Sequence, residues 1–387
     1  MDLATFERLL SPIGQALLAE VGACAGVETD LALGTRLRRD HDPALVAAAV
    51  TQNHLRGRAR AKLGPDAATL YFTPDALQQA TRARVAEHRA VRMATAGRRS
   101  AVDLGCGIGG DLIALSRAGL SVQGVDLDPV RVRIAQANLA ALGLDGDVRV
   151  ADATAVDRSG ADVCFVDPAR REGGGRRFDP RVCAPDWQFV TELLDGAAAA
   201  KVAPGIAHDL VPHGVEVEWV SDGGDLVEAC LWGRQLATAT RRVTVLPAGA
   251  TLTDANAPAE QVVGPVGGWL YEPVDAVGRA GLVTAVAHQV QGRLVDPHLA
   301  YVSSDRLVDT PFATAYEVLA ELPYRERPLR AALRSRGVGT LTIKRRGVDV
   351  VPEALRRRLA LRGDAEATIV LTRVAGAGRA LLVERVR

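Results

Sequence analysis

A glycine-rich turn is the first feature of this sequence that could do chemistry. It reads Asp103-Leu-Gly-Cys-Gly-Ile-Gly-Gly110, and glycine lets a backbone turn sharply and approach a ligand that a Cβ atom would block. A helix is expected to follow, and the free N–H groups of its first turn can face the same ligand. Because Gly105, Gly107 and Gly110 satisfy the spacing GxGxxG, the glycines alone allow a dinucleotide as well as another adenosine-containing cofactor.

The acid that precedes the glycines separates the two kinds of cofactor. A dinucleotide places its pyrophosphate at such a turn, where the carboxylate of Asp103 would repel it. S-adenosylmethionine (SAM) has no phosphate and carries a cationic amino group and a sulfonium, both of which a carboxylate attracts. We therefore predict that Asp103, Gly105, Gly107 and Gly109 bind SAM and that the protein is a methyltransferase.

Further acids follow the next two expected strands. Asp126 ends one of these strands, where a carboxylate can accept hydrogen bonds from both ribose hydroxyls of an adenosine. Asp152 and Ala153 follow the other strand and are predicted to meet the adenine, although a lone acid there can also be a turn residue. Asp128 stands before Pro129 and is instead predicted to cap a helix that begins at that proline.

A fourth expected strand delivers an acid and a proline to its carboxyl end, where ligands bind in open α/β sheets. The segment Val163-Cys-Phe-Val-Asp-Pro-Ala-Arg-Arg171 resembles the [DNS]-P-P-[YFW] motif of amino-methyltransferases. In that motif a side chain and a backbone carbonyl hold a planar nitrogen while an aromatic ring stacks on the base. The resemblance implies that Asp167 and Pro168 orient the methyl acceptor, so that catalysis is mainly positioning and charge placement.

The segment departs from that motif at two positions. Ala169 replaces the second proline, and Arg170 replaces the aromatic residue. Arginine can stack on a base or bind phosphate, so Arg170 is predicted to act with Asp167 and Pro168. The glycine-rich, basic segment 173–178 is expected to be a mobile active-site loop. Aromatic residues that could replace the missing ring, or could equally be core or lid residues, are Tyr71, Phe72, Phe178 and Trp187.

Cysteines near the same segments raise a second mechanism, the methylation of a pyrimidine at carbon 5, which needs a thiolate nucleophile. Cys164 should lie inside a buried strand and Cys106 beneath the cofactor, and Cys183 is the third candidate. No activating base is evident beside Cys106 or Cys164, so this mechanism is disfavoured.

The elements that must position these residues follow from hydrophobic periodicity. Residues 1 to about 97 are predicted to be helical, with one helix running from Pro74 past Val85 towards Met93. From Ala101 short strands alternate with helices, which predicts a parallel sheet. The expected strands are 101–104, 122–125, 148–150, 163–166 and 242–246, with a late hairpin formed by 215–220 and 225–231.

The last third of the chain is less regular. Trp187–Ala200 is predicted to be one helix, and the segment Gly264–Pro273 to be a loop that precedes helical stretches. Residues 340–344, 352–361, 367–373 and 379–386 form a predicted βαββ unit, compact enough for a small module of its own.

Charge is segregated along the chain although its net value is only +1. Residues 322–387 contain 16 basic and 6 acidic residues, and residues 56–99 contain 10 basic and 3 acidic residues. Two basic segments that flank an acidic middle favour contact with a polyanion, unless the arginines simply decorate exposed helix faces. Five scattered cysteines without a CxxC pair predict neither a disulfide framework nor a metal site, and with no apparent signal peptide they suit a cytoplasmic protein.

The whole chain resembles the bacterial, largely actinobacterial, class I SAM-dependent methyltransferases that carry a C-terminal THUMP-like domain. The segments that carry this resemblance are 166–171, 201–205, 218–222, 270–273 and 343–349. It implies an α/β fold with a Rossmann-like sheet, an N-terminal helical region and a small α+β THUMP-like module. The expected boundaries are 1–97 for the helical region, 98–250 for the methyltransferase domain, 251–321 for a connecting region and 322–387 for the module.

THUMP domains in other enzymes bind structured RNA, chiefly tRNA. The resemblance therefore implies an RNA methyltransferase, and a weaker similarity to the trimethylguanosine synthase group points to a guanine amine. Two alternatives stay open: a methyltransferase that acts on a protein or small metabolite, and a SAM-binding RNA-binding protein without turnover.

Overall fold

The computed structural model describes residues 1–24, 26–170, 183–258 and 260–386. The chain divides into two compact units. The first comprises Met1–Val215 and Cys230–Ala237, and the second comprises Glu216–Ala229 and Thr238–Arg387. Within the described ranges, no helix has both the length and the apolar character needed to cross a bilayer.

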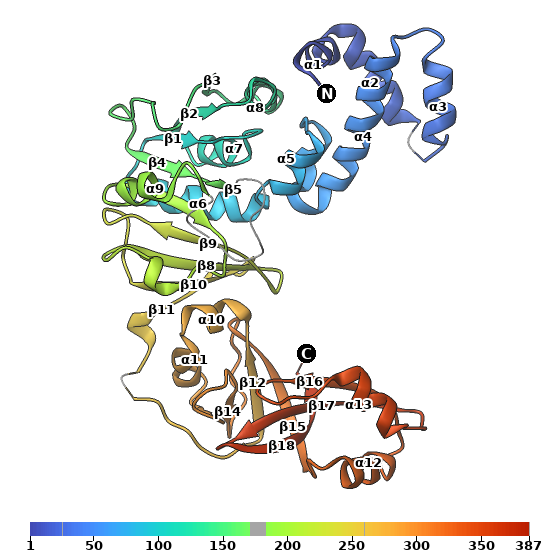
Figure 1. Cartoon of the computed structure of the whole chain (residues 1–387), viewed down its shortest axis with the longest axis vertical. Coiled ribbons are helices and arrows are strands. Elements are labelled where there is room, and N and C mark those ends of the chain that lie inside the picture. The colour runs from blue at the N-terminus through green and yellow to red at the C-terminus, as the bar shows by residue number, and fades with distance from the viewer. Residues whose placement is uncertain (25, 171–182, 259, 387) are drawn as a thin grey trace. The chain divides into compact units, whose positions relative to one another are not determined.

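Helices form the first part of the first unit, as the sequence predicts (Figure 1). Most of them begin at a residue whose side-chain oxygen accepts a hydrogen bond from a backbone N–H of the first turn, such as Asp2, Ser11 and Asp42. The elements are α1 (Leu3–Leu10), α2 (Pro12–Ala23), α3 (Asp30–Leu37), α4 (Pro43–Leu63), η1 (Gly64–Ala68), α5 (Pro74–Gln79) and α6 (Ala83–Thr95).

The predicted single helix from Pro74 to Met93 is wrong, because α5 ends at Gln79 and α6 begins at Ala83. The reason lies in α4. The ammonium group of Lys62 donates hydrogen bonds to the carbonyl oxygens of Leu77 (3.1 Å) and Gln78 (2.9 Å). In a continuous helix these two carbonyls would accept from the N–H groups four residues later. Lys62 takes that role, and the intervening backbone becomes extended.

A parallel sheet follows the helices and confirms the alternating pattern from Ala101 onward. Its strands hydrogen-bond in the order β7-β4-β1-β2-β3, and the Cys230–Trp232 end of β9 extends the sheet beyond β7. Helices α7 and α8 are the crossovers between β1, β2 and β3, which a parallel arrangement requires. The bounds are β1 (Ser100–Leu104), α7 (Gly110–Arg117), β2 (Ser121–Asp126), α8 (Pro129–Ala141), β3 (Asp147–Val150), β4 (Val163–Val166), β5 (Ala169–Arg170), β6 (Cys183–Ala184), α9 (Trp187–Leu194), β7 (Ala198–Val202), η3 (His208–Leu210) and β9 (Asp225–Trp232).

The predicted helix Trp187–Ala200 is half right. Helix α9 ends at Leu194, and Ala198–Ala200 belong instead to β7, where they pair with Cys164–Val166 of β4. Alanine favours helices when its surroundings do not decide. Here Gly196 lies between the two elements, and the three alanines are fully buried in the middle of the sheet. Tertiary packing therefore overrides local propensity.

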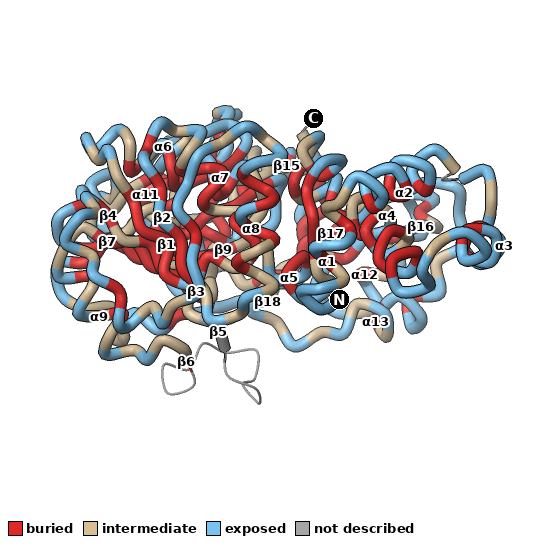
Figure 2. Tube along the Cα trace, turned by 90° about the horizontal axis from the view of Figure 1, so that it is seen from above, coloured by how far each residue is buried: buried red, intermediate tan, exposed pale blue. Residues whose placement is uncertain are grey.

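One hydrophobic core joins the helices and the sheet within the first unit. It includes Phe6 and Phe72 from the helical part together with Ile108, Leu112 and Phe165 from the sheet part, all at most 6% exposed. Figure 2 shows these buried stretches along the strands and along α7 and α8. The N-terminal helices are thus part of the same folded body as β1–β4.

The second unit contains the rest of the predicted hairpin and a separate sheet. Strand β8 (Glu216–Asp222) is joined to β9 through Gly223 and Gly224, as expected, and β10 (Arg241–Leu246) and β11 (Ala250–Thr253) pair beside β8. The separate sheet has the order β13-β14-β12-β15-β18-β17-β16. Its unit contains η4 (Asp254–Asn256), β12 (Trp269–Pro273), α10 (Asp275–Ala280), α11 (Val283–Gln289), β13 (Arg293–Leu294), β14 (Val302–Ser304), β15 (Ala313–Leu322), α12 (Glu326–Arg334), β16 (Val338–Arg345), α13 (Pro352–Leu359), β17 (Ala365–Val374) and β18 (Ala377–Arg385).

The C-terminal βαββ unit is confirmed by β16, α13, β17 and β18. The loop predicted over Gly264–Pro273 is wrong at its end, because Trp269–Pro273 form β12 between β14 and β15. This strand carries a proline and is too short for a clear alternation. Its partners lie more than 25 residues away along the chain, so local sequence patterns do not reveal it.

Candidate active site

The glycine-rich turn connects β1 to α7. The N–H groups of Gly105 and Cys106 both donate to the carbonyl oxygen of Val125 at 2.9 Å, which fixes the turn on β2. Gly105 and Gly109 have positive φ values of 102° and 84°, a region that favours glycine. A Cβ atom on Gly109 would lie 3.2 Å from the Cβ of Ala135 in α8, so glycine at this position allows the start of α7 to pack closely against α8.

Asp103 lies beneath this turn and is 1% exposed. Its Oδ1 has no hydrogen-bond partner in the described part of the chain. Burial, together with the nearby carboxylates of Asp111 and Asp167, raises the pKa of Asp103 well above its ordinary value. A buried carboxylate oxygen without a partner is costly. Asp103 therefore fits a ligand that brings a cationic group, such as the amino group of SAM.

Asp126 ends β2 and is tied to the turn. Its Oδ2 accepts a hydrogen bond from the N–H of Gly107 at 3.0 Å, and its Oδ1 accepts one from the N–H of Asp128 at 2.9 Å. The carboxylate is thus held by backbone donors and is only half-buried, which suits a role towards ribose hydroxyls.

Two exposed apolar residues flank Asp126, and the sequence analysis did not predict them. Leu127 is 71% exposed, and Val150 at the end of β3 is 54% exposed. Both residues lie at the carboxyl ends of neighbouring parallel strands, where ligands bind in open α/β sheets. A large apolar residue directly after a strand-terminal acid is the signal that could have found Leu127.

The predicted cap at Asp128 is confirmed. Its Oδ1 accepts hydrogen bonds from the N–H groups of Val130 (2.8 Å) and Arg131 (3.4 Å) at the start of α8. Asp152 is exposed, and its Oδ1 accepts from both the N–H and the Oγ1 of Thr154 at 2.8 Å. These bonds build a turn that leaves Ala153 half-buried after β3. An adenine-binding role for Asp152 and Ala153 stays a prediction.

Asp167 follows β4 and lies beside the glycine-rich turn. A Cβ atom on Gly105 would be 4.0 Å from the carbonyl oxygen of Asp167, which brings the expected acceptor motif and the expected cofactor turn together. Oδ2 of Asp167 forms an ion pair of 2.6 Å with Nζ of Lys201, and Pro168 is half-buried. Lys201 stands 34 residues further along the chain and was not predicted as a site residue.

The rest of the predicted acceptor motif is described only in part. The backbone of Ala169–Arg170 forms β5, which pairs with Cys183–Ala184 of β6. The side-chain role predicted for Arg170, and the predictions for Arg171 and for the loop 173–178 with Phe178, lie outside the described residues.

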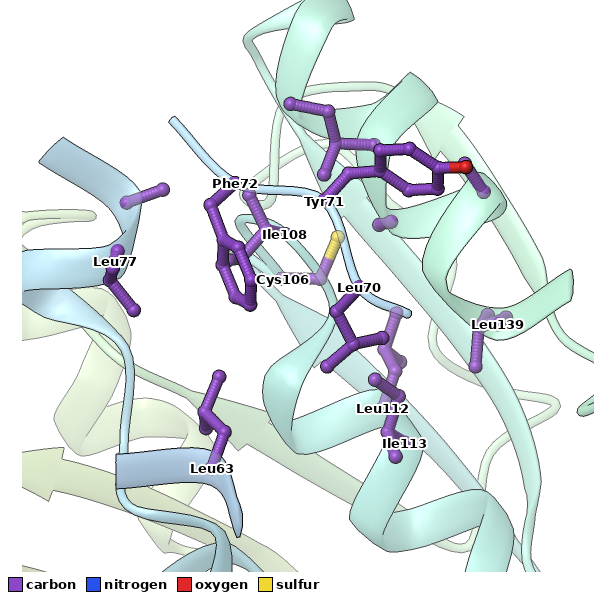
Figure 3. Packing of buried hydrophobic residues seen from close by; sticks show 14 of the residues in the cluster. Leu63, Leu70, Tyr71, Phe72, Leu77, Cys106, Ile108, Leu112, Ile113 and Leu139 are labelled. Atoms are coloured by element: carbon purple, nitrogen blue, oxygen red, sulfur yellow. The ribbon is translucent and has the colours of Figure 1, made fainter. Parts of the chain in front are cut away.

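The candidate stacking rings differ in exposure. Tyr71 is 6% exposed and Phe72 is fully buried, so both are core residues, and Figure 3 shows them with Leu70 and Ile108 in the buried cluster. Trp187 at the start of α9 is half-buried. Of the described candidates, only Trp187 keeps exposed surface that a base could meet.

The cysteines do not favour a thiolate mechanism. Burial and the carboxylates of Asp103 and Asp126 raise the pKa of the Cys106 thiol far above its ordinary value. Burial also raises the pKa of Cys164. Both effects oppose the formation of a thiolate at neutral pH, as expected from the sequence.

Two buried polar residues support the glycine-rich turn, and the sequence analysis did not predict them either. Arg89 of α6 is 3% exposed, forms an ion pair with Asp111 of α7, and lies 4.4 Å above the ring centroid of Phe165. Its positive charge acts to lower the pKa of Asp103, against the larger effect of burial. Asn138 of α8 donates to the carbonyl oxygen of Ile108 within the turn at 2.9 Å.

Comparison with known proteins identifies related domains along the chain. Residues 101–167 match a family model described as a methyltransferase domain, and residues 313–385 match one described as THUMP domain-like. Residues 2–59 match a domain of unknown function, DUF8688.

Whole-chain relatives match as well. Two uncharacterized SAM-dependent methyltransferases of Mycobacterium tuberculosis, from strains CDC 1551 / Oshkosh and ATCC 25618 / H37Rv, are each 40% identical over 335 residues. The matches cover 84% of this chain and 91% of each relative. A crystal structure of a proposed methyltransferase from Porphyromonas gingivalis W83 has the same fold, with a TM-score of 0.78 and 23% identity, covering 96% of this chain and 97% of that one.

Proposed function

Because this chain belongs to the class I SAM-dependent methyltransferases with a C-terminal THUMP-like domain, we propose that it methylates a base nitrogen in structured RNA. The candidate acceptors are tRNA and rRNA, with a guanine amine as the candidate position. The observation that carries the proposal is the position of Asp167 at the end of β4, with its backbone beside Gly105 of the turn and its side chain half-exposed.

In this proposal the turn and its neighbouring acids hold the cofactor. Asp103 faces the cationic amino group, Gly105, Gly107 and Gly109 give the backbone room to approach, and Asp126 accepts from the ribose hydroxyls. Asp152 and Ala153 meet the adenine. Bound SAM supplies an electrophilic methyl group on its sulfonium.

The acceptor site is proposed to consist of Asp167 and Pro168, with Arg170 against a base or phosphate. Asp167 accepts hydrogen bonds from the amine, which orients the nitrogen lone pair and stabilises the positive charge that develops on nitrogen. Such a site needs no nucleophilic side chain, which agrees with the raised pKa values of the Cys106 and Cys164 thiols.

An arginine surface in the C-terminal domain supports RNA as the acceptor. Helices α12 and α13 bury their leucines and present exposed arginines on their other sides, where Glu326 and Glu353 are the only acids of the two helices. We call this set the arginine surface: Arg327, Arg334, Arg356, Arg357 and Arg358. Its excess positive charge is complementary to an RNA backbone, and phosphate contacts of this kind set the register of a bound nucleic acid.

The proposal is tested by comparing nucleoside mass spectra of tRNA and rRNA from wild-type cells and from cells that lack the gene. A methylated base that disappears in the deletion strain and returns with the wild-type gene supports it. An unchanged modification profile in every stable RNA rejects it. In that case a protein or metabolite acceptor becomes the better explanation. The affinity for such an acceptor should change little with salt concentration, whereas the affinity for RNA should fall steeply.

A further inference from the structure

Strand register places a lysine directly beside the expected acceptor residue. Strands β4 and β7 run parallel, with Val166 opposite Ala200. The next residues are therefore Asp167, directly after the end of β4, and Lys201 in β7. Nζ of Lys201 lies 2.6 Å from Oδ2 of Asp167, and within the described ranges no residue donates a hydrogen bond to Oδ1.

Several carboxylates lie near the Lys201–Asp167 ion pair. Asp167 contributes to the raised pKa of Asp103, as do Asp111 and Asp126. Lys201 brings a positive charge into the same neighbourhood from β7. Burial lowers the pKa of Lys62, and the charge of Lys201 lowers it further. The ion pair with Lys201 thus offsets the charge of one carboxylate in a group of four.

We propose that Lys201 is a positioning residue for methyl transfer, because its contact with Oδ2 fixes Asp167 so that Oδ1 is presented to the amine of the acceptor. This inference rests on the proposed function. It adds a residue that lies outside the acceptor motif and outside residues 101–167, which match the methyltransferase domain model, and it assigns different tasks to the two oxygens of one carboxylate.

The reaction uses this arrangement as follows. The nitrogen lone pair forms the new N–C bond to the methyl group while the C–S bond breaks and its electron pair stays on sulfur. The nitrogen becomes positively charged, faces Oδ1 of Asp167, and then loses a proton to water. Without Lys201 the carboxylate is free to rotate, and the orientation of the amine, on which the rate depends, is lost.

A purely structural role is a weak explanation for this ion pair. The side chains of Lys201 and Asp167 are 19% and 37% exposed, and ion pairs that keep such contact with solvent contribute little to stability. The pair Arg133–Glu7 in the same unit has the same N–O distance of 2.6 Å and side-chain exposures of 31% and 48%. Arg133→Met therefore serves as a matched control for the loss of an ion pair.

The test compares full-length wild-type protein with Lys201→Met, Lys201→Arg and Arg133→Met. The assay transfers a labelled methyl group from SAM to total RNA purified from cells that lack the gene, and calorimetry measures the Kd for SAM. We expect Lys201→Met to lower kcat at least tenfold with a Kd for SAM within twofold of wild type. Lys201→Arg should retain at least a third of the rate, and Arg133→Met should behave as wild type.

A double variant tests whether Lys201 acts through Asp167. Asp167→Asn should keep measurable activity, because the related motif also accepts asparagine at this position. Adding Lys201→Met to Asp167→Asn should lower the rate by less than twofold more. Independent effects that multiply, or a fully active Lys201→Met, overturn the inference while leaving the proposed function intact. If the wild-type protein transfers no methyl group to this RNA, the proposed function fails, and the inference fails with it.

Discussion

Asn138 and Tyr71 exchange two hydrogen bonds across 67 residues of sequence: Oδ1 of Asn138 accepts from the N–H of Tyr71 at 2.7 Å, and Nδ2 donates to its carbonyl oxygen at 3.1 Å. The same Nδ2 also donates to Ile108 in the glycine-rich turn. Gln52 of α4 makes the equivalent two bonds with the next residue, Phe72, at 3.0 and 2.6 Å. The segment between η1 and α5 is thus held by two buried amides, of which only one touches the turn.

Replacing Asn138 by alanine should impair both folding and cofactor binding. It leaves three buried backbone groups without partners, so the free energy of unfolding should fall by roughly 2–4 kcal/mol. Loss of the bond to Ile108 should also weaken SAM binding at least fivefold. Gln52→Ala is the matched control and should lower stability while leaving the Kd for SAM of the folded protein unchanged. Equal effects of both variants on this Kd would show that Asn138 does not support the turn.

Asp103→Asn should stabilise the protein in the absence of SAM. Burial raises the pKa of Asp103, whose Oδ1 has no partner among the described residues, so ionisation of this group costs more in the folded protein than in the unfolded chain, and the neutral amide removes that cost. We expect the free energy of unfolding at pH 8 to rise on the order of 1–3 kcal/mol, while SAM binding is lost. The gain should shrink at lower pH, because a carboxyl whose pKa is raised in the folded protein lowers stability progressively as the pH rises from its unfolded pKa to its folded pKa. Denaturant unfolding at pH 5 and pH 8 measures both effects, and a less stable variant at pH 8 would contradict this account of Asp103.

The affinity for SAM should depend on pH through the same carboxyl group. Below its raised pKa, Asp103 is protonated in the free protein, so binding a cationic ligand must release that proton. The Kd for SAM should therefore rise as the pH falls. Calorimetry in two buffers with different ionisation enthalpies should detect the released proton on the acidic side, and no proton release in either buffer would exclude Asp103 as the contact to the cation.

Charge reversal on the arginine surface should weaken RNA binding without affecting the cofactor. Arg327→Glu combined with Arg357→Glu would remove two of the proposed phosphate contacts, so the slope of log K against log salt should become shallower by roughly 2. The Kd for SAM should stay within twofold of wild type. Arg39→Glu, an exposed arginine after α3, is the control for a change of net charge. Unaltered RNA affinity in the double variant would remove the arginine surface from the proposed interface.

Local patterns predicted the parts of the molecule in which neighbouring residues decide the outcome. The turn at Asp103–Gly110, the cap at Asp128 and most of the parallel strands depend on short-range spacing and were predicted correctly. The alanines of β7 were mistaken for helix because only their burial between other strands makes them a strand. The break before α6 was missed because it depends on Lys62, a residue of another helix.

The residues of the candidate site also fall into those that local sequence patterns predict and those that depend on the pairing of distant strands. Asp103, Asp126 and Asp167 each lie at or next to the carboxyl end of a strand that the sequence pattern predicts. Lys201 reaches Asp167 only through the pairing of β4 with β7, and single-sequence patterns contain no signal for that register.

The common core of the first unit has a consequence for how this protein can change over generations. Phe6 and Phe72 pack in one cluster with Ile108 and Leu112 of the catalytic sheet region. Recombination that exchanged the first hundred residues for an unrelated segment would strip the back of the cofactor turn and expose its apolar side. The shared cluster therefore makes the packing behind this turn depend on the helical segment as well as on the sheet.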